Sequence, residues 1–217
     1  MLRKFIFALS AIAVITGFDN ADTQNAFAGA AEMAESELVI SAYDDIFRAA
    51  SAEEGCDWLL MSAIAYTESR FEADIVSQRG ALGLMQIMPV VGRHFNVPES
   101  EIIEPLTNVR LAARLLAEIE RMLRIPAGIP ERDRMGIVLA GYNSGVGHVR
   151  DARRLAREAG ENPNSWEVVA RYLKLKAEPE YYDKPEVLSG RFTGSRQTLA
   201  YVNGVMECYD RYKNMML

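Results

Sequence analysis

The sequence is poor in the residues that build metal centres and reactive thiol sites. It contains two histidines and two cysteines among 217 residues. His94 and His148 lack metal-ligand spacing, and neither Cys56 nor Cys208 lies in a CxxC pair or near a histidine. We therefore expect no metal, no cofactor and no cysteine nucleophile. The sequence leaves open whether the two cysteines form a disulfide or stay as buried free thiols.

Runs of positive charge are also absent, and the formal net charge is −6. An acidic chain without a basic run argues against nucleic acid as a partner. The content of 49% hydrophobic and 25% charged residues is ordinary for a globular protein and too apolar for a disordered one. The chain is therefore expected to form one compact domain.

The apolar run at residues 5–18 is shorter than the roughly 20 residues that a membrane-spanning helix needs. It follows Arg3 and Lys4 and precedes small residues, which is the pattern of a cleaved secretory signal peptide. No cysteine comes directly after it, which argues against lipoprotein processing. We expect a signal peptide over residues 1–28, a linker over residues 29–40, and an exported, periplasmic protein without a membrane span in its mature form. The alternative is an N-terminal membrane anchor.

No segment alternates apolar and polar residues with period two, and no internal repeat is visible. Helix-start signals recur instead, as at Asp57, Pro105 and Ser165, followed by apolar residues at helical spacing. The fold class is therefore predicted to be all-α, in one domain over residues 41–217, with a loop over residues 177–194. Helices are expected over residues 41–52, 58–71, 105–123, 131–140, 144–159, 166–176 and 195–214, with a helical turn beginning at residue 89.

One glutamate lies on the apolar side of the helix predicted over residues 58–71. On a wheel of about 100° per residue, the apolar arc holds Leu60, Met61, Ile64 and Phe71. The opposite side holds Ser62, Tyr66, Ser69 and Arg70. Glu68 falls inside the apolar arc, near the helix end, where neighbours that exclude water raise a carboxyl pKa toward neutrality. We predict Glu68 as a proton donor at a cleft edge; the alternative is an ordinary ion pair or a helix cap.

A loop that suits a ligand follows this helix. Its Gly80-Ala81-Leu82-Gly83 segment can lay bare backbone along a ligand. The next residues, Leu84-Met85-Gln86, add apolar surface beside an amide that can bind sugar hydroxyls or an acetamido group. This pattern suggests a sugar-binding site but does not establish one.

Four motifs resemble, in order and spacing, those of the family 1 lytic transglycosylases. They are Glu68-Ser69-Arg70-Phe71 with Ser77, Gly83-Leu84-Met85-Gln86-Ile87-Met88-Pro89, Gly141-Tyr142-Asn143-Ser144-Gly145, and Thr198-Leu199-Ala200-Tyr201-Val202. The resemblance covers residues 43–212 and is nearest to the catalytic domain of the membrane-bound transglycosylase F branch. It implies a lysozyme-like helical bundle, the transglycosylase SLT domain, with a glycan-binding groove.

The resemblance implies that the substrate is peptidoglycan and that Glu68 is the single catalytic residue. Glu68 would protonate the oxygen of the β-1,4 bond between N-acetylmuramic acid and N-acetylglucosamine. The N-acetyl group would stabilise the cationic centre, so the second carboxylate of an ordinary glycosidase is not expected. Ionised Glu68 would then deprotonate the C6 hydroxyl, which closes on C1 to give a 1,6-anhydro end. No protein partner is indicated.

The resemblance also implies six substrate contacts. The positions are Ser77, Met85, Gln86, Tyr142, Asn143 and Tyr201. Ser77 would orient the N-acetyl group, the Met-Gln pair would line sugar subsites, and the Tyr-Asn pair would contact the glycan near the acid. Tyr201 would close the pocket within hydrogen-bond reach of the acid. The residue types alone leave simpler roles open, namely a turn residue at Ser77, a core residue at Met85 and packing roles for the tyrosines.

Two residues depart from the family pattern. Gly141 replaces an alanine, which is expected to alter only local packing or flexibility. Gln197 stands where the family usually has a glutamate, and an amide keeps hydrogen bonding but loses the charge. Slower turnover or a shifted pH optimum is therefore expected.

Two other functions stay open at this point. A hydrolytic muramidase would cut the same bond and would need a positioned water and a second acid such as Asp74. A non-catalytic peptidoglycan-binding protein would keep the groove without turnover, and Gln197 is the only residue that hints at it.

Overall fold

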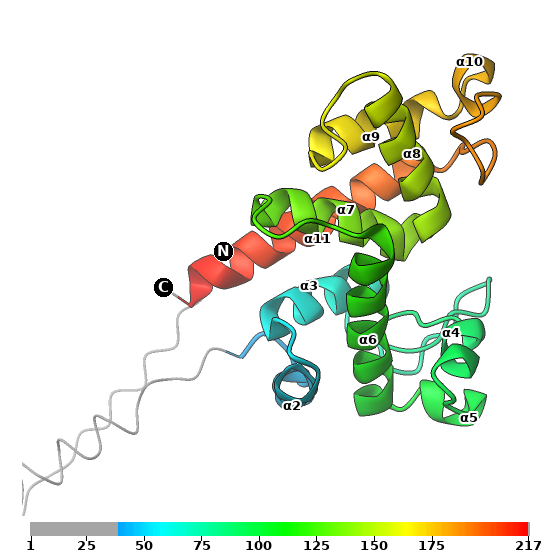
Figure 1. Ribbon diagram of the computed structural model, residues 1–217. Coiled ribbons are helices and arrows are strands. Elements are labelled where there is room, and N and C mark those ends of the chain that lie inside the picture. The colour runs from blue at the N-terminus through cyan, green and yellow to red at the C-terminus, as the bar shows by residue number, and fades with distance from the viewer. Residues whose placement is uncertain (1–38, 217) are drawn as a thin grey trace, which may run out of the picture. The chain divides into compact units, whose positions relative to one another are not determined.

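The computed structural model describes residues 39–216, which form a set of packed α-helices joined by loops (Figure 1). This part of the chain has no strand, only two isolated bridges that join Val76 to Leu82 and Leu82 to Ile87. The predicted all-α class is confirmed. The helices are α2 (Asp44–Glu54), α3 (Trp58–Ser69), α4 (Pro89–His94), α5 (Glu99–Ile102), α6 (Pro105–Leu123), α7 (Glu131–Ser144), α8 (Val146–Glu158), α9 (Trp166–Leu175), α10 (Pro179–Tyr182) and α11 (Ser195–Met215).

The predicted signal peptide, residues 1–28, lies outside the described residues, as does the predicted linker apart from its last two positions. Among the helices of residues 39–216, none combines the length and the apolar content that crossing a membrane requires. The thiols of Cys56 and Cys208 are free in the structure. Cys56 is partly buried and contacts the Ser51 hydroxyl at 3.4 Å, whereas Cys208 is only 2% exposed. Of the two alternatives that the sequence leaves open, the structure therefore has the free thiols.

Helix α3 carries Glu68 and begins where the sequence predicts. The Asp57 carboxylate caps it by accepting a hydrogen bond from the Leu59 N–H at 2.8 Å. The helix is buried around most of its circumference, so the predicted division into an apolar and a polar side is wrong. Ser62 is fully buried, and its hydroxyl donates to the Trp58 carbonyl at 2.9 Å. A serine can enter the core in this way because its own helix satisfies its hydroxyl.

The chain leaves α3 in a strained conformation two residues after Glu68. The helix ends two residues before the predicted end, and Arg70 and Phe71 adopt φ values of 57° and 66°. Residues other than glycine rarely adopt these angles. The Phe71 ring packs against Phe47 and Tyr66, with centroids 6.2 and 5.7 Å apart, and the Arg70 guanidinium lies 4.2 Å from the Tyr66 ring centroid. These ring contacts hold the turn in place.

The two longest helices connect parts of the fold that are distant in sequence. Helix α6 begins at Pro105, and the Glu104 carboxylate accepts hydrogen bonds from the Leu106 and Thr107 N–H groups. It packs against α2, α7 and α8. Helix α11 contacts α3, α7 and α9, so the last helix of the chain lies beside the helix that carries Glu68 (Figure 1).

Helix α2 begins at Asp44 rather than at Ser41. The Asp44 carboxylate accepts hydrogen bonds from the Ser41 N–H at 3.0 Å and from its hydroxyl at 2.9 Å. The side-chain contact between these two residues is therefore present, but Tyr43 is the residue that precedes the first helical position. The helix ends at Gly55, which has a left-handed φ of 69°.

Helix α7 extends beyond its predicted end at residue 140, so Tyr142 and Asn143 lie in its last turn. Ser144 was predicted to begin the next helix, but its hydroxyl donates to the carbonyl four residues earlier at 2.7 Å and closes α7 instead. Gly145, with φ 89°, separates the two helices, and α8 begins at Val146. Glycine suits this junction because it adopts positive φ without strain.

Two further predictions about the C-terminal half are corrected. Ser165 does not cap α9; the Asp133 carboxylate accepts the hydrogen bond from the Trp166 N–H at 2.7 Å. This cap comes from another helix, so no local pattern could reveal it. The segment predicted as loop over residues 177–194 contains the short helix α10.

Candidate active site

Glu68 lies in the last turn of α3 and is partly buried. Tyr142 of α7 and Tyr201 of α11 lie close enough to interact electrostatically with it. Burial, together with the negative charge of Glu68, raises the pKa of both tyrosines well above the ordinary value. Three helices that are far apart in sequence therefore bring one carboxyl and two phenol hydroxyls together. Three of the residues predicted to act in the site are neighbours in the structure.

Burial raises the pKa of Glu68 from 4.5 to about 7, because removal of water disfavours the charged carboxylate. The partial negative charge at the C-terminal end of α3 acts in the same direction. The Tyr201 hydroxyl opposes these effects by stabilising the ionised form, and it lowers the pKa by a smaller amount. With a pKa near 7, the carboxyl is about half protonated at neutral pH and can either donate or accept a proton.

The Tyr201 hydroxyl is buried and has no well-aligned hydrogen-bond partner among residues 39–216. It nevertheless acts on the Glu68 carboxyl strongly enough to affect its pKa. The two groups are therefore adjacent, but the hydrogen bond between them is not formed with good geometry. Catalytic hydrogen bonds are often long or poorly aligned before a substrate binds, and they tighten in the complex.

The loop around Met85 is fastened to the site by side chains from three helices. The Ser69 hydroxyl of α3 donates to the Leu84 carbonyl at 2.9 Å, and the Tyr142 hydroxyl of α7 donates to the Met85 carbonyl at 2.7 Å. The Met85 N–H in turn donates to Oδ1 of Asn108, on α6, at 2.7 Å. The wheel predicts that Ser69 faces outward, but it faces inward. A carbonyl of its own helix and the Leu84 carbonyl of the loop both accept a hydrogen bond from its hydroxyl.

Asn108 is a structural residue of the site that the sequence did not reveal. It is fully buried, and its amide donates to the carbonyls of Leu82 and Ile102 at 2.9 and 2.7 Å. A Cβ atom at Gly83 would lie 2.8 Å from the Asn108 amide nitrogen, and Gly83 has φ 73°. The asparagine side chain therefore fills the space that the sequence interpretation reserved for a ligand. No local signal identifies Asn108, because its partners lie at other points of the chain.

Two predicted contact residues use their side chains within the loop. The Ser77 hydroxyl accepts a hydrogen bond from the Ala81 N–H at 2.9 Å and closes a turn. Gln86 adopts φ 50°, and its Nε2 donates to the Gly83 carbonyl at 3.0 Å. Within residues 39–216, no hydrogen bond joins either side chain to Glu68. Their contact with substrate stays a prediction.

The remaining predicted contacts occupy different environments. The Met85 side chain is fully buried in the core, so only its backbone takes part in the hydrogen bonds of the loop. Oδ1 of Asn143 accepts a hydrogen bond from the Thr198 hydroxyl at 3.0 Å. Thr198 is 2% exposed and lies three residues before Tyr201. This bond ties the last turn of α7 to the first turns of α11, and Thr198 had been given no role in the sequence interpretation.

Asp74 and Gln197 are both exposed. Asp74, the example given of a second acid for a hydrolytic mechanism, lies in the loop between α3 and α4. Gln197 lies on α11, one helical turn before Tyr201. Its predicted effect on the rate or pH optimum stays a prediction.

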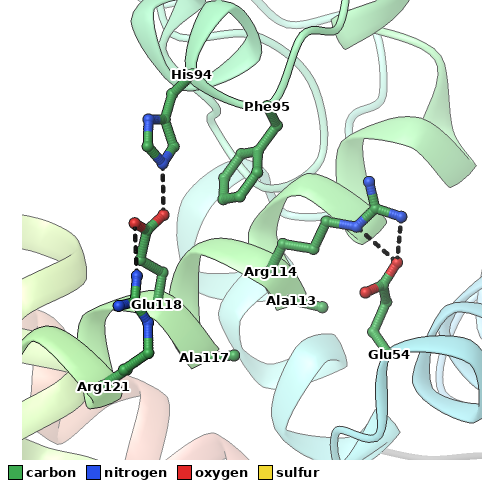
Figure 2. A pocket seen from close by; sticks show the side chains of 8 residues that line it. All are labelled: Glu54, His94, Phe95, Ala113, Arg114, Ala117, Glu118 and Arg121. Carbon is green, nitrogen blue, oxygen red and sulfur yellow. Dashed lines mark hydrogen bonds and ion pairs between the residues drawn. The ribbon is translucent and has the colours of Figure 1, made fainter.

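A separate hollow of about 420 Å³ lies between α4, α6 and the end of α2 (Figure 2). Glu118 contacts His94 at 2.6 Å and Arg121 at 3.2 Å, while Arg114 contacts Glu54 at 2.7 Å (Figure 2). Both carboxylates of this hollow therefore have cationic partners, and the tyrosines of the site take no part in it. Across residues 39–216, the histidine, cysteine and acidic side chains form no group of three or more suited to a metal ion.

Solved structures share this helical fold. The chain is similar to the lytic transglycosylase Slt from Pseudomonas aeruginosa, with a TM-score of 0.52 and 21% identity over 89% of this chain and 29% of that chain. It is also similar to the 70 kDa soluble lytic transglycosylase from Escherichia coli, with a TM-score of 0.51 and 23% identity over 81% of this chain and 24% of that chain. At these identities the likeness shows the fold, which is the one expected from the sequence.

The family model described as the transglycosylase SLT domain matches residues 45–165, more than half of the chain. The chain therefore belongs to the transglycosylase SLT domain family. It is 36% identical to the membrane-bound lytic murein transglycosylase F of Alcanivorax borkumensis over 77% of this chain and 34% of that protein. For the same protein of Marinobacter nauticus the identity is 34%, over 77% of this chain and 32% of that protein. The chain thus spans about a third of the length of these relatives, and the predicted family and branch are confirmed.

Proposed function

We propose that this chain is a peptidoglycan lytic transglycosylase that uses Glu68 as its single acid and base. The observation that carries the proposal is a partly buried carboxyl with a pKa of about 7 beside the hydroxyls of Tyr142 and Tyr201. Membership of the transglycosylase SLT domain family supports it. The substrate is the β-1,4 bond between N-acetylmuramic acid and N-acetylglucosamine in glycan strands.

The reaction needs one proton to move in two directions. Protonated Glu68 gives its proton to the glycosidic oxygen, and N-acetylglucosamine leaves with that oxygen as a hydroxyl. The N-acetyl carbonyl of the muramic acid stabilises the positive charge that develops at C1. The Glu68 carboxylate then takes the proton of the C6 hydroxyl while O6 bonds to C1. The carboxyl ends protonated, as it began, and no water is consumed.

The neighbours of Glu68 have distinct parts in this proposal. Tyr201 donates its free hydroxyl to the carboxylate after the first proton transfer, when the negative charge appears. Tyr142 holds the loop around Met85 at the site through its hydrogen bond to the Met85 carbonyl. Asn143, Gln86 and Ser77 are the remaining groups proposed to contact the glycan, and Met85 contributes through its backbone because its side chain is enclosed.

Digestion of purified sacculi, followed by mass spectrometry of the soluble fragments, tests the proposed reaction. Anhydro-ended muropeptides, which are one water lighter than hydrolytic products, are expected. Reducing ends would instead identify a hydrolytic muramidase, for which the exposed Asp74 is the available second carboxylate. Binding to sacculi without any released fragment would identify a non-catalytic wall-binding protein.

Replacement of the acid tests the assignment of Glu68. We expect Glu68→Gln to abolish glycan cleavage, because an amide cannot donate a proton to the leaving oxygen, while binding to sacculi stays measurable. Glu72→Gln is the matched control, since Glu72 is exposed and lies in the loop that follows α3. It should cleave at the rate of the unaltered protein. Full turnover by Glu68→Gln would disprove the assignment.

We also propose that the chain is exported, with residues 1–28 removed as a signal peptide, residues 29–40 as a linker and residues 41–217 as the catalytic SLT domain. The basic start and the apolar run at residues 5–18 support this arrangement. N-terminal sequencing of the protein recovered from the periplasmic fraction provides the test. A new N-terminus near residue 29 is expected, and an intact N-terminus retained in the membrane fraction would contradict it.

A further inference from the structure

Five arginines surround one concave site of about 450 Å³ between the C-terminal end of α6 and helix α8. They are Arg124, Arg150, Arg153, Arg154 and Arg157, and we call them the arginine cluster. The two helices are in contact (Figure 1). Helix α8 alone supplies four of the five arginines. Because the formal net charge of the chain is −6, this surface has the opposite sign to the molecule as a whole.

The arginines are held largely by neutral groups. Arg150 donates to the Met122 carbonyl at 2.9 Å, and Arg153, which is only 3% exposed, donates to the Pro163 carbonyl at 2.9 Å. Arg154 donates through Nε to another backbone carbonyl at 2.6 Å. These bonds fix the guanidinium groups without cancelling their charge. Three of the five arginines are therefore ordered in advance of any ligand.

Within the part of the chain that the structure describes, one carboxylate pairs with the cluster, and it also has a second cationic partner. Asp151 is fully buried and contacts both Arg154 and Lys176, the latter at 2.6 Å. One negative charge thus faces two positive ones, and within residues 39–216 no ion pair compensates the other four arginines. Arg124 and Arg157 are exposed, and among residues 39–216 neither has an ion-pair partner. Burial, together with the positive charge of Arg157, lowers the pKa of Arg153, as expected where like charges crowd together.

Guanidinium groups gathered at a concave surface select oxyanions, which the exposed guanidinium forks can bind through pairs of parallel N–H···O bonds. The excess of positive charge matches a phosphate dianion better than a single carboxylate. We propose that the arginine cluster binds a phosphate group, either as free phosphate or as the phosphate monoester of a lipid headgroup. None of its residues belongs to the site around Glu68, so this binding is independent of the proposed reaction.

The two arginines whose side chains have no hydrogen-bonded partner among the described residues provide the test. We would remove them together in Arg124→Gln/Arg157→Gln, because these side chains hold no part of the fold in place. Arg93→Gln/Arg211→Gln is the matched control, since Arg93 and Arg211 are also exposed and the change in net charge is the same. Thermal unfolding of both double variants should match that of the unaltered protein.

Two probes separate the sources of the phosphate group. The first is inorganic phosphate, followed by titration calorimetry, and the second is phosphatidylcholine vesicles with and without phosphatidic acid, followed by co-sedimentation. We expect saturable binding in at least one arm, weakened about tenfold or more in Arg124→Gln/Arg157→Gln through the loss of charge-assisted hydrogen bonds. Binding by the control should be unchanged.

The outcomes are distinct. Binding of free phosphate identifies a soluble ligand, and binding only of vesicles that contain phosphatidic acid identifies a lipid headgroup. The proposal is overturned if neither probe binds, or if the two double variants lose binding equally. It is also overturned if succinate binds as tightly as phosphate, because the cluster would then be a carboxylate site.

Discussion

Tyr201 is the residue that tunes how Glu68 titrates. Its hydroxyl stabilises the ionised carboxyl and thereby offsets part of the effect of burial. Its phenol ring lies in the core at 9% exposure, so phenylalanine can replace it without a change in shape. The hydroxyl has no well-aligned partner within residues 39–216, which means that its removal leaves no other group newly unpaired. A substitution at Tyr201 can therefore change the Glu68 pKa without changing the packing of the core.

We expect the pH profile of cleavage to report the Glu68 pKa. The proton donor is the neutral carboxyl, so activity should be full below pH 7 and fall as the pH rises through about 7. In Tyr201→Phe the Glu68 pKa rises further, and the fall in kcat/KM moves to higher pH. The measurement is the rate of sacculus solubilisation from pH 5 to 9.

Tyr142→Phe is the matched control, because it also removes a phenol hydroxyl near Glu68 but one that does not shift the Glu68 pKa. It loses the hydrogen bond to the Met85 carbonyl, so the free energy of unfolding should fall by about 1 kcal/mol while the pH at which activity falls stays unchanged. An unchanged pH profile in Tyr201→Phe would show that the Tyr201 hydroxyl does not act on the acid.

At the scale of elements, the loop around Met85 depends on a glycine that leaves room for Asn108. We expect Gly83→Ala to destabilise the protein by about 2–4 kcal/mol, because it adds a left-handed alanine and a clash with a side chain that three hydrogen bonds hold in place. Activity should fall with it, since the loop meets Tyr142 beside Glu68. Urea unfolding and the cleavage assay provide the measurements.

Gly80→Ala separates strain from the clash. Gly80 has a φ of 79°, similar to that of Gly83, but nothing lies within 4 Å of a Cβ atom placed there. Gly80→Ala should lower the free energy of unfolding by about 1–2 kcal/mol, which is the cost of a left-handed alanine without a clash. Equal destabilisation by the two alanines would mean that Asn108 gives way and does not fasten the loop.

Elements whose ends depend on local chemistry were predictable, and those whose ends depend on distant partners were not. Asp57 and Pro105 begin α3 and α6 as predicted, since a cap and a first-turn proline act within a few residues. The cap of α9 comes from Asp133, on another helix, and Ser69 turns inward to bond the loop around Met85. The same reason hid Asn108, whereas the helix itself indicated that the Glu68 carboxyl would be shielded from water and have a raised pKa.

At the scale of the whole molecule, the candidate site forms only when α11 packs against α3. Tyr201 comes from α11, the last helix, and lies beyond the residues matched by the family model, so its place beside Glu68 depends on the packing of α11 against α3. Cys208 lies further along α11 and is 2% exposed. The reactivity of this thiol therefore reports whether α11 is packed against the rest of the domain.

We expect Cys208 to resist thiol reagents in the folded protein and to react as α11 detaches. Cys56 is partly buried, and burial raises its thiol pKa, so it should react slowly but before Cys208. Labelling with a chromogenic disulfide reagent across a urea series, read beside cleavage activity, provides the measurement. Activity and Cys208 protection should disappear together.

Cys56→Ser keeps Cys208 as the reporter and removes the other thiol signal. In the unaltered protein, two reactive thiols should appear on full denaturation without a reductant. The absence of any would mean that the purified protein contains a disulfide between these residues.

The unpaired Tyr201 hydroxyl determines which inhibitor chemistry suits the site at a given pH. Below pH 7 the neutral Glu68 and Tyr201 both present O–H donors. A ligand oxygen that accepts hydrogen bonds from both is therefore the better fit. Above pH 7 the carboxylate attracts the tyrosine proton, and a cationic ligand is the better fit. Screens at pH 6 and pH 8 should therefore select different compounds from one library.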